Sequence, residues 1–212
     1  MFRCFIVYLV FTTCLIRAAH AECRSIIELD QKNRNALIES MDSDGGYLIL
    51  MRHSHKGVED LSDDGIKYIK SHRNNIKSFD NFQNDRFLWS APSRYGMCNR
   101  VRHTSELIHG KDNKCSSDKH LYIQNISDWL SITDFNNKIY FIAINSTLIK
   151  DFFINRFEGS GDFEMAEGIV MKLVEGQPVC KARFYLGQLV KSGGSAPCWA
   201  PEGTIGHREV CE

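Results

Sequence analysis

Hydrophobic residues occur in short uncharged runs that alternate with stretches of helical spacing, a pattern typical of an α/β fold. The apolar runs predict strands at residues 47–51, 86–89, 121–123 and 138–144, of which the last is the clearest central strand. Later in the chain, residues 169–174 and 179–186 flank the turn-forming stretch 175–178. These two runs predict an antiparallel hairpin at the edge of the sheet.

Helices are predicted between the strands. Ser25 and Glu28 form a capping-box pattern that predicts a helix over about 25–41. Ser62, followed by two aspartates, predicts a second helix up to about Lys77, which makes a β-α-β crossover with the strands on either side. Two more helices are expected, one over about 99–109 and one after residues 145–147.

The two ends of the chain differ from its middle. Arg3, the apolar run 5–16 and the small-x-small stretch 19–21 predict a signal peptide over residues 1–21, although an uncleaved anchor is the alternative. Residues 22–190 then form one domain. Residues 191–212 are rich in Gly and Pro, contain Cys198 and Cys211, and predict a disulfide-stabilised tail. We therefore expect a secreted or periplasmic protein without a membrane span after signal cleavage.

Cysteine usage agrees with export. Of eight cysteines, six remain after removal of residues 1–21. An even number in an exported chain favours disulfides, and fifteen pairings are open. The simplest pairing joins Cys98 to Cys115, which leaves four cysteines to fasten the tail and the amino terminus. Because no CxxC pair occurs, we expect no zinc site. No other metal and no cofactor are expected.

The charges of the chain balance, with 26 basic and 26 acidic residues. This balance argues against a nucleic-acid surface. Any anionic ligand would need a local cluster of cations, and one follows the first predicted strand at Arg52.

Three predicted strands end in polar loops: residues 52–56 after the first, 90–102 after the second and 145–147 after the central one. In α/β sheets such loops converge on a crevice outside the carboxyl ends of the strands, where ligands bind. The order of these motifs resembles the histidine phosphatase superfamily over about residues 46–186. The resemblance rests on Arg52-His53-Ser54, Leu61-Ser62-x-x-Gly65, Ser90-Ala91-Pro92, Arg100-x-x-x-Thr104 and the segment 142–148.

The resemblance implies a three-layer α/β/α sandwich with a mostly parallel sheet. Exported members that act on lipopolysaccharide core heptose phosphate look most similar, which implies a phosphorylated small molecule or glycan phosphate as the partner. His53 would be the nucleophile that forms a phosphohistidine, and Arg52 and Arg100 would neutralise the phosphate oxygens. Arg94, in an apparent insertion, is the alternative to Arg100.

Other residues have open roles. Asn145 is either a helix cap or a phosphate ligand, and His55 is either a surface histidine or a compensating donor. The proton for the leaving oxygen could come from Glu59, Asp60 or Asp128.

Two departures from the family pattern affect the expected activity. Ile144 stands where the family has a second histidine, and Ser54 replaces the glycine of Arg-His-Gly. Loss of one preorganised donor typically costs on the order of 10² to 10³ in rate. The sequence therefore favours a phosphomonoester-binding protein with weak or altered phosphohydrolase activity. The alternative is an inactive binding module on the same fold.

Overall fold

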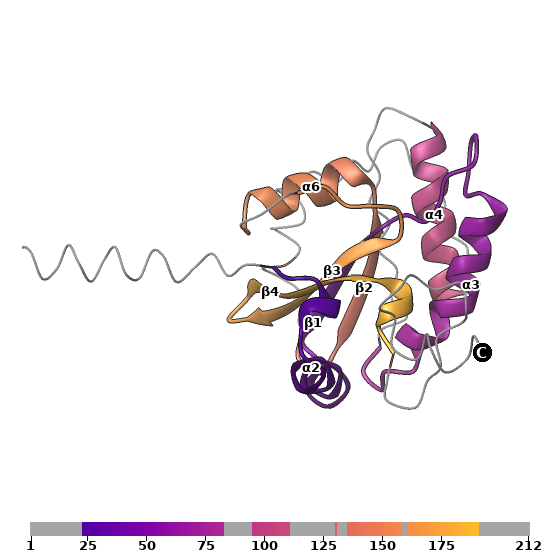
Figure 1. Cartoon of the computed structure of the whole chain (residues 1–212). Coiled ribbons are helices and arrows are strands. Elements are labelled where there is room, and N and C mark those ends of the chain that lie inside the picture. Colours follow the sequence, from indigo (N-terminus) through magenta and orange to yellow (C-terminus); the bar gives the residue numbers. More distant parts are fainter. Residues whose placement is uncertain (1–22, 83–94, 111–129, 131–134, 158–160, 191–212) are drawn as a thin grey trace, which may run out of the picture.

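The computed structural model describes residues 23–82, 95–110, 130, 135–157 and 161–190. Within them the chain forms an α/β fold around a four-stranded sheet (Figure 1). The strands are β1 (Tyr47–Arg52), β2 (Ile139–Ile144), β3 (Glu167–Val174) and β4 (Gln177–Tyr185). Their order in the sheet is β2-β1-β3-β4, so β1 occupies a central position.

The sheet is mixed, and the prediction of a mostly parallel sheet is wrong for the described strands. Only β1 and β2 pair in parallel; β1 with β3 and β3 with β4 are antiparallel. The predicted hairpin is confirmed as β3 and β4, turning at Glu175 and Gly176, which both have positive φ. The hairpin contributes two of the four described strands, and its strand β3 pairs directly with β1. The strands predicted at residues 86–89 and 121–123 lie outside the described residues.

The helices follow the predicted order with one correction. Helix α3 (Asp63–Lys77) begins after Ser62, whose Oγ accepts from Gly65 N at 3.1 Å. The predicted helix over 25–41 is divided in two, because the chain is extended at Leu29 and Asp30. The other helices are η1 (Ile26–Glu28), α2 (Gln31–Asp44), α4 (Tyr95–His109), α6 (Ser146–Ile154) and η2 (Leu186–Gln188).

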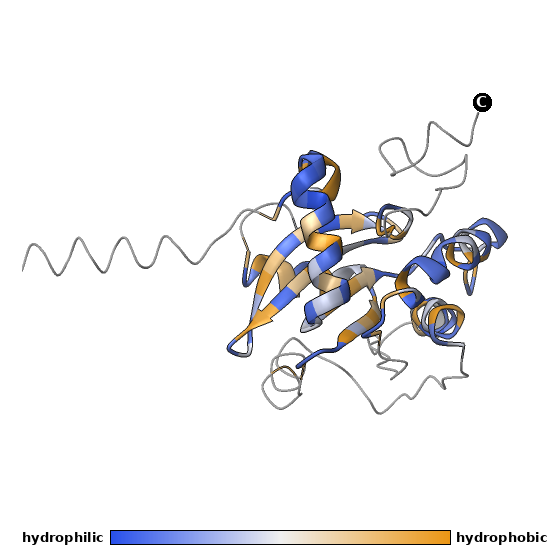
Figure 2. Cartoon of the chain, turned by 90° about the horizontal axis from the view of Figure 1, so that it is seen from below, coloured by the Kyte–Doolittle hydropathy of each residue, from blue (hydrophilic) through white to orange (hydrophobic). Residues whose placement is uncertain are grey.

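Apolar side chains form two clusters that share β1. Ile49 and Met51 belong to a cluster with residues of α2, α3 and α4, whereas Leu48 and Leu50 belong to a cluster with residues of α6. Because successive side chains of a strand point to opposite faces, helices pack on both faces of β1. Figure 2 shows the matching pattern, with hydrophobic and hydrophilic positions alternating along the helices.

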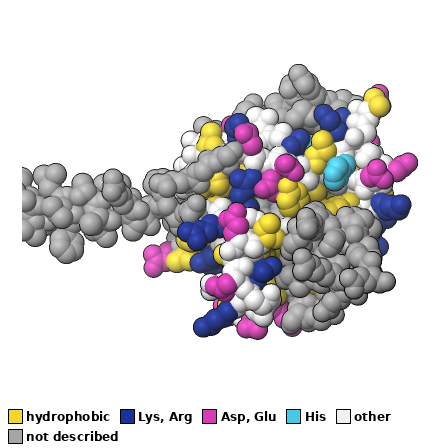
Figure 3. All heavy atoms as spheres, viewed as in Figure 1, with side chains coloured by type: hydrophobic (Ala, Val, Ile, Leu, Met, Phe, Trp, Pro, Cys, Tyr) yellow, Lys and Arg dark blue, Asp and Glu magenta, His cyan; other side chains and the backbone are white. Residues whose placement is uncertain are grey.

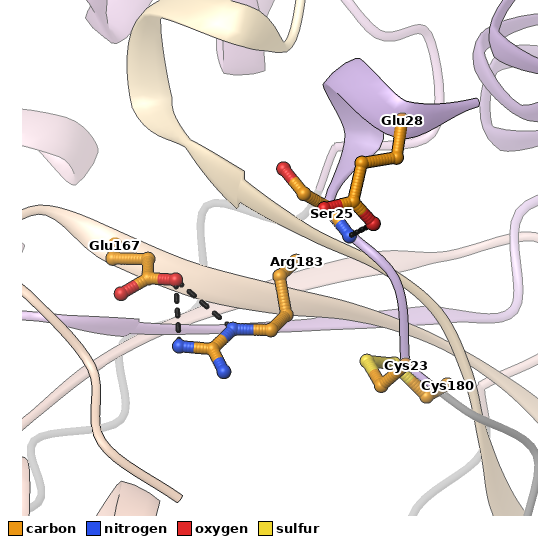
Figure 4. Close-up of a disulfide and its surroundings, with 6 residues drawn as sticks. All are labelled: Cys23, Ser25, Glu28, Glu167, Cys180 and Arg183. Carbon is orange, nitrogen blue, oxygen red and sulfur yellow. Dashed lines mark hydrogen bonds and ion pairs between the residues drawn. A yellow bond between two sulfur atoms is a disulfide. The ribbon is translucent and has the colours of Figure 1, made fainter. Parts of the chain in front are cut away.

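A disulfide joins Cys23 to Cys180 on β4 (Figure 4), with a Cα–Cα distance of 5.5 Å. Next to it, Arg183 N donates to Arg24 O at 2.7 Å. Cys98 is also disulfide-bonded. Its partner lies outside the described residues, as do the predicted Cys98–Cys115 pairing, the signal segment 1–21 and the tail 191–212. The prediction that cysteines of this chain form disulfides is therefore confirmed.

The described surface has mixed charge. On the face drawn in Figure 3, basic and acidic side chains are interspersed with hydrophobic ones. Among the described residues, no helix has the length and apolarity needed to cross a membrane.

Candidate functional site

Strands β1 and β2 run in parallel and end level with each other. Arg52 is in register with Ile144, and His53 N donates to Ile144 O at 3.0 Å. Residues 53–54 and Asn145 therefore leave the sheet at the same edge. We call Arg52, His53, Ser54 and Asn145 the edge site.

His53 is 4% exposed and is neutral near pH 7. Burial is the main reason that its pKa falls to about 4, and the positive charges of Arg52, Arg100 and Lys56 lower it further, against the hydrogen bond with Ser54 O. That hydrogen bond joins His53 Nδ1 to the Ser54 carbonyl at 2.8 Å. Because a carbonyl only accepts, the proton of the neutral ring is on Nδ1 and the lone pair is on Nε2. Nε2 has no hydrogen-bond partner among the described residues.

Ser54 occupies the glycine position of the family motif and has a structural function. It is fully buried, its Oγ donates to Gly65 O at 3.2 Å and its N donates to Thr104 Oγ1 at 3.3 Å. A Cβ on Gly65 would lie 2.5 Å from His55 O. The start of α3 can therefore approach the loop after β1 this closely only because residue 65 is a glycine.

Arg52 is half-buried at the end of β1. Its Nη1 donates to Phe163 O at 2.6 Å, and its Nε is buried without a hydrogen-bond partner among the described residues. Burial lowers the pKa of Arg52, whereas the negative charges of Glu164 and Glu167 raise it. Its guanidinium thus keeps unused donors next to His53.

Arg100 lies close enough to lower the pKa of His53, but its hydrogen bonds go elsewhere. Its Nη2 donates to Gly57 O at 3.1 Å and to Val58 O at 2.8 Å, and its Nε donates to Asp60 O at 3.3 Å. In this structure Arg100 holds the loop that follows the edge site. Its function as a phosphate clamp stays a prediction, and Arg94, the alternative, lies outside the described residues.

The two polar atoms of the Asn145 side chain differ in their contacts. Its Oδ1 accepts from Leu148 N at 2.9 Å, which confirms the helix cap of α6. Its Nδ2 is buried and has no hydrogen-bond partner among the described residues. An unpartnered buried donor is costly, so this amide is suited to an acceptor on a ligand.

Ile144 supplies no such donor. Its side chain is fully buried in the apolar cluster that contains Leu148 and Ile149 of α6. His55 is exposed, with its ring edge-on to Tyr68 at 6.1 Å between centroids. A ligand contact of His55 stays a prediction.

The three candidate acids differ in exposure and in contacts. Glu59 is exposed, Asp60 Oδ1 accepts from Leu61 N at 2.7 Å and lies 3.2 Å from His103 Nδ1, and Asp128 is outside the described residues. Glu164 and Glu167, whose charges act on Arg52, were not predicted as residues near the site. The signal was weak, because Glu164 precedes β3 and Glu167 begins it, and the hairpin was predicted at the sheet edge without a stated partner strand.

The described residues contain no group of three or more His, Cys, Asp or Glu side chains that could hold a metal ion. Comparison with protein-family models, with curated proteins and with solved structures gives no match for this chain.

Proposed function

We propose that this chain binds a phosphomonoester at the edge site and hydrolyses it slowly through a phosphohistidine at His53. The observation that carries the proposal is the state of the His53 ring. It is neutral, with its proton on Nδ1 facing Ser54 O and its Nε2 lone pair unpartnered among the described residues. A neutral imidazole nitrogen with an available lone pair is the form that can attack phosphorus.

The groups around His53 suit a phosphate dianion. Arg52 offers unused guanidinium donors, and Asn145 Nδ2 offers an unpartnered amide donor from the neighbouring strand end. Charge-assisted hydrogen bonds from a guanidinium neutralise the oxygens that would otherwise repel the nucleophile. The resemblance to histidine phosphatases supports the same reaction class.

Slow turnover is the expected consequence of the apolar residue at position 144. With the Ile144 side chain in the core, one donor toward the transferring group is missing, a loss on the order of 10² to 10³ in rate. Arg100 is engaged with backbone carbonyls, which removes a second family feature. These two observations favour a second candidate function, an inactive module that binds phosphate esters without hydrolysing them.

The wider setting is part of the proposal. We infer an exported protein with the three-layer α/β/α arrangement, acting on a phosphorylated small molecule or glycan phosphate. The Cys23–Cys180 disulfide supports an oxidising compartment, and the two apolar clusters that share β1 support the layers.

The test compares the full mature chain with His53→Ala. Phosphate release from a panel of phosphomonoesters is measured, together with the shift in unfolding temperature caused by inorganic phosphate. Turnover by the parent protein that disappears in His53→Ala supports the hydrolase. Stabilisation by phosphate without turnover supports the binding module, and turnover that survives His53→Ala refutes the nucleophile assignment.

A further inference from the structure

The segment that precedes β3 is bonded to the edge site. Arg52 Nη1 donates to Phe163 O at 2.6 Å, and Ala166 N donates to His53 O at 3.2 Å. The residues between Phe163 and Ala166 are therefore fixed against the end of β1. One of them, Glu164, carries an exposed carboxylate.

The other side of this segment is fixed by Arg183 of β4. Its Nε and Nη2 donate to Glu167 Oε1 at 2.9 and 2.7 Å, an ion pair drawn in Figure 4. The guanidinium also stacks on the ring of Phe163, 4.4 Å from its centroid. Glu167 Oε2 in turn accepts from Glu164 N at 2.7 Å. Because Glu167 is largely buried, this pairing holds the backbone of residue 164 in one place.

The carboxylates of Glu164 and Glu167 differ in how many of their oxygens accept hydrogen bonds. Glu167 uses both oxygens within the protein. Glu164 Oε2 accepts from the Tyr185 hydroxyl at 2.7 Å, and its Oε1 has no hydrogen-bond partner among the described residues. Burial is the larger effect on the pKa of Arg52 and lowers it, whereas the negative charge of Glu164 raises it. Of these two carboxylates, Glu164 is therefore the one with an oxygen left for a ligand.

We propose that Glu164 is the residue that transfers protons in the reaction at His53. This inference rests on the proposed function. In the first step His53 Nε2 forms a bond to phosphorus, the bond from phosphorus to the ester oxygen breaks, and that oxygen takes the proton of the Glu164 carboxyl. In the second step a water oxygen attacks phosphorus and gives a proton to the Glu164 carboxylate. The phosphorus–nitrogen bond breaks, its electron pair returns to Nε2, and the products are alcohol and phosphate.

The hydrogen bonds that Phe163 O and Ala166 N make with Arg52 and His53 place the segment that carries Glu164 beside the edge site. This position suits a group that is an acid in the first step and a base in the second.

The experiment uses two esters with different leaving groups. The glycerol oxygen of glycerol phosphate would leave as a basic alkoxide and needs a proton, whereas p-nitrophenyl phosphate releases p-nitrophenolate, a stable anion. Glu164→Gln keeps the backbone amide that bonds to Glu167 but cannot donate an acidic proton. Glu39→Gln is the matched control, because Glu39 is an exposed glutamate on α2 and is not part of the edge site. Phosphate release is measured for both variants and the parent protein.

We expect Glu164→Gln to slow glycerol phosphate hydrolysis by about 10²-fold or more and p-nitrophenyl phosphate hydrolysis by less than about tenfold. Glu164→Asp, which keeps a carboxyl, should recover part of the loss, and Glu39→Gln should have no selective effect. An equal loss on both esters, or no loss, overturns the assignment of Glu164 and leaves His53 in place. A parent protein that releases no phosphate and never carries phosphate on His53 overturns the proposed function, and this inference with it.

Discussion

Two of the buried histidines, His53 and His72, should make this protein sensitive to mild acid. His53 is 4% exposed and His72 is 1% exposed, and burial lowers the pKa of each from 6.5 to about 4. The ring of His72 packs against Tyr68, with 4.7 Å between centroids, and against Gly187 of η2. Neither side chain can take up a proton in the folded state until the pH approaches about 4.

The sign of the effect follows from proton linkage. In the unfolded chain both rings bind protons as the pH falls through about 6.5, whereas in the folded protein they do not. Acidification therefore stabilises the unfolded state, and the loss of folding free energy continues until the pH reaches the folded value of about 4. Between pH 7.5 and 5.5 each histidine should cost about 1.4 kcal/mol, or about 3 kcal/mol for the pair.

The assay is urea unfolding followed by far-ultraviolet circular dichroism at pH 7.5 and 5.5, a range above most carboxyl titrations. His72→Gln should reduce the difference in unfolding free energy between the two pH values by about 1.4 kcal/mol. Lost packing in the variant lowers the unfolding free energy equally at both pH values, so it cancels in the difference between them. His55→Gln, which removes an exposed histidine, is the control. If His72→Gln retains the full pH difference, the argument from burial is refuted.

Three further predictions concern the edge site and its supports. Asn145→Ser keeps a capping hydroxyl for Leu148 N but removes the unpartnered Nδ2. It should weaken inorganic phosphate binding while costing less than about 1 kcal/mol in stability. Equal phosphate affinity of variant and parent, measured as the shift in unfolding temperature, would contradict this prediction. Gly65→Ala should lower the unfolding free energy by about 1 to 3 kcal/mol and weaken phosphate binding, because the new Cβ would meet His55 O. Gly176 has positive φ but open space around it, so Gly176→Ala should lower stability without affecting phosphate binding. A matched loss of binding in both glycine variants would rule out this reading. Replacing Cys23 and Cys180 together by serine should cost about 2 to 5 kcal/mol in urea unfolding, and an unchanged midpoint would count against a stabilising disulfide.

Local signals in the sequence account for much of the fold. The uncharged runs of β1 and β2, the cap at Ser62 and the turn at Glu175 and Gly176 each depend on neighbouring residues, and each was predicted. The break between η1 and α2 was missed because Ser25 and Glu28 do interact, with Ser25 N donating to Glu28 Oε2, but around a single turn. A capping pattern shows where a turn starts and does not show how far the helix continues.

The pairing of the strands could not be read in the same way. Nothing local to β3 specifies that it pairs with β1, and this pairing is what brings Glu164 and Glu167 to Arg52. Arg52 and His53 could be predicted as neighbours of a site because they directly follow the apolar run 47–51. The three carbonyls that bind Arg100 belong to a loop whose shape depends on tertiary contacts, so its hydrogen bonds were not predictable.

The central place of β1 has a consequence for folding during synthesis. This strand is made before either of its partners, since β2 and β3 both come much later in the chain. During synthesis its uncharged residues and both of its hydrogen-bonding edges stay open to other chains, which is the situation that promotes aggregation. We expect the nascent chain to depend on a chaperone that shields this strand until β3 has been made.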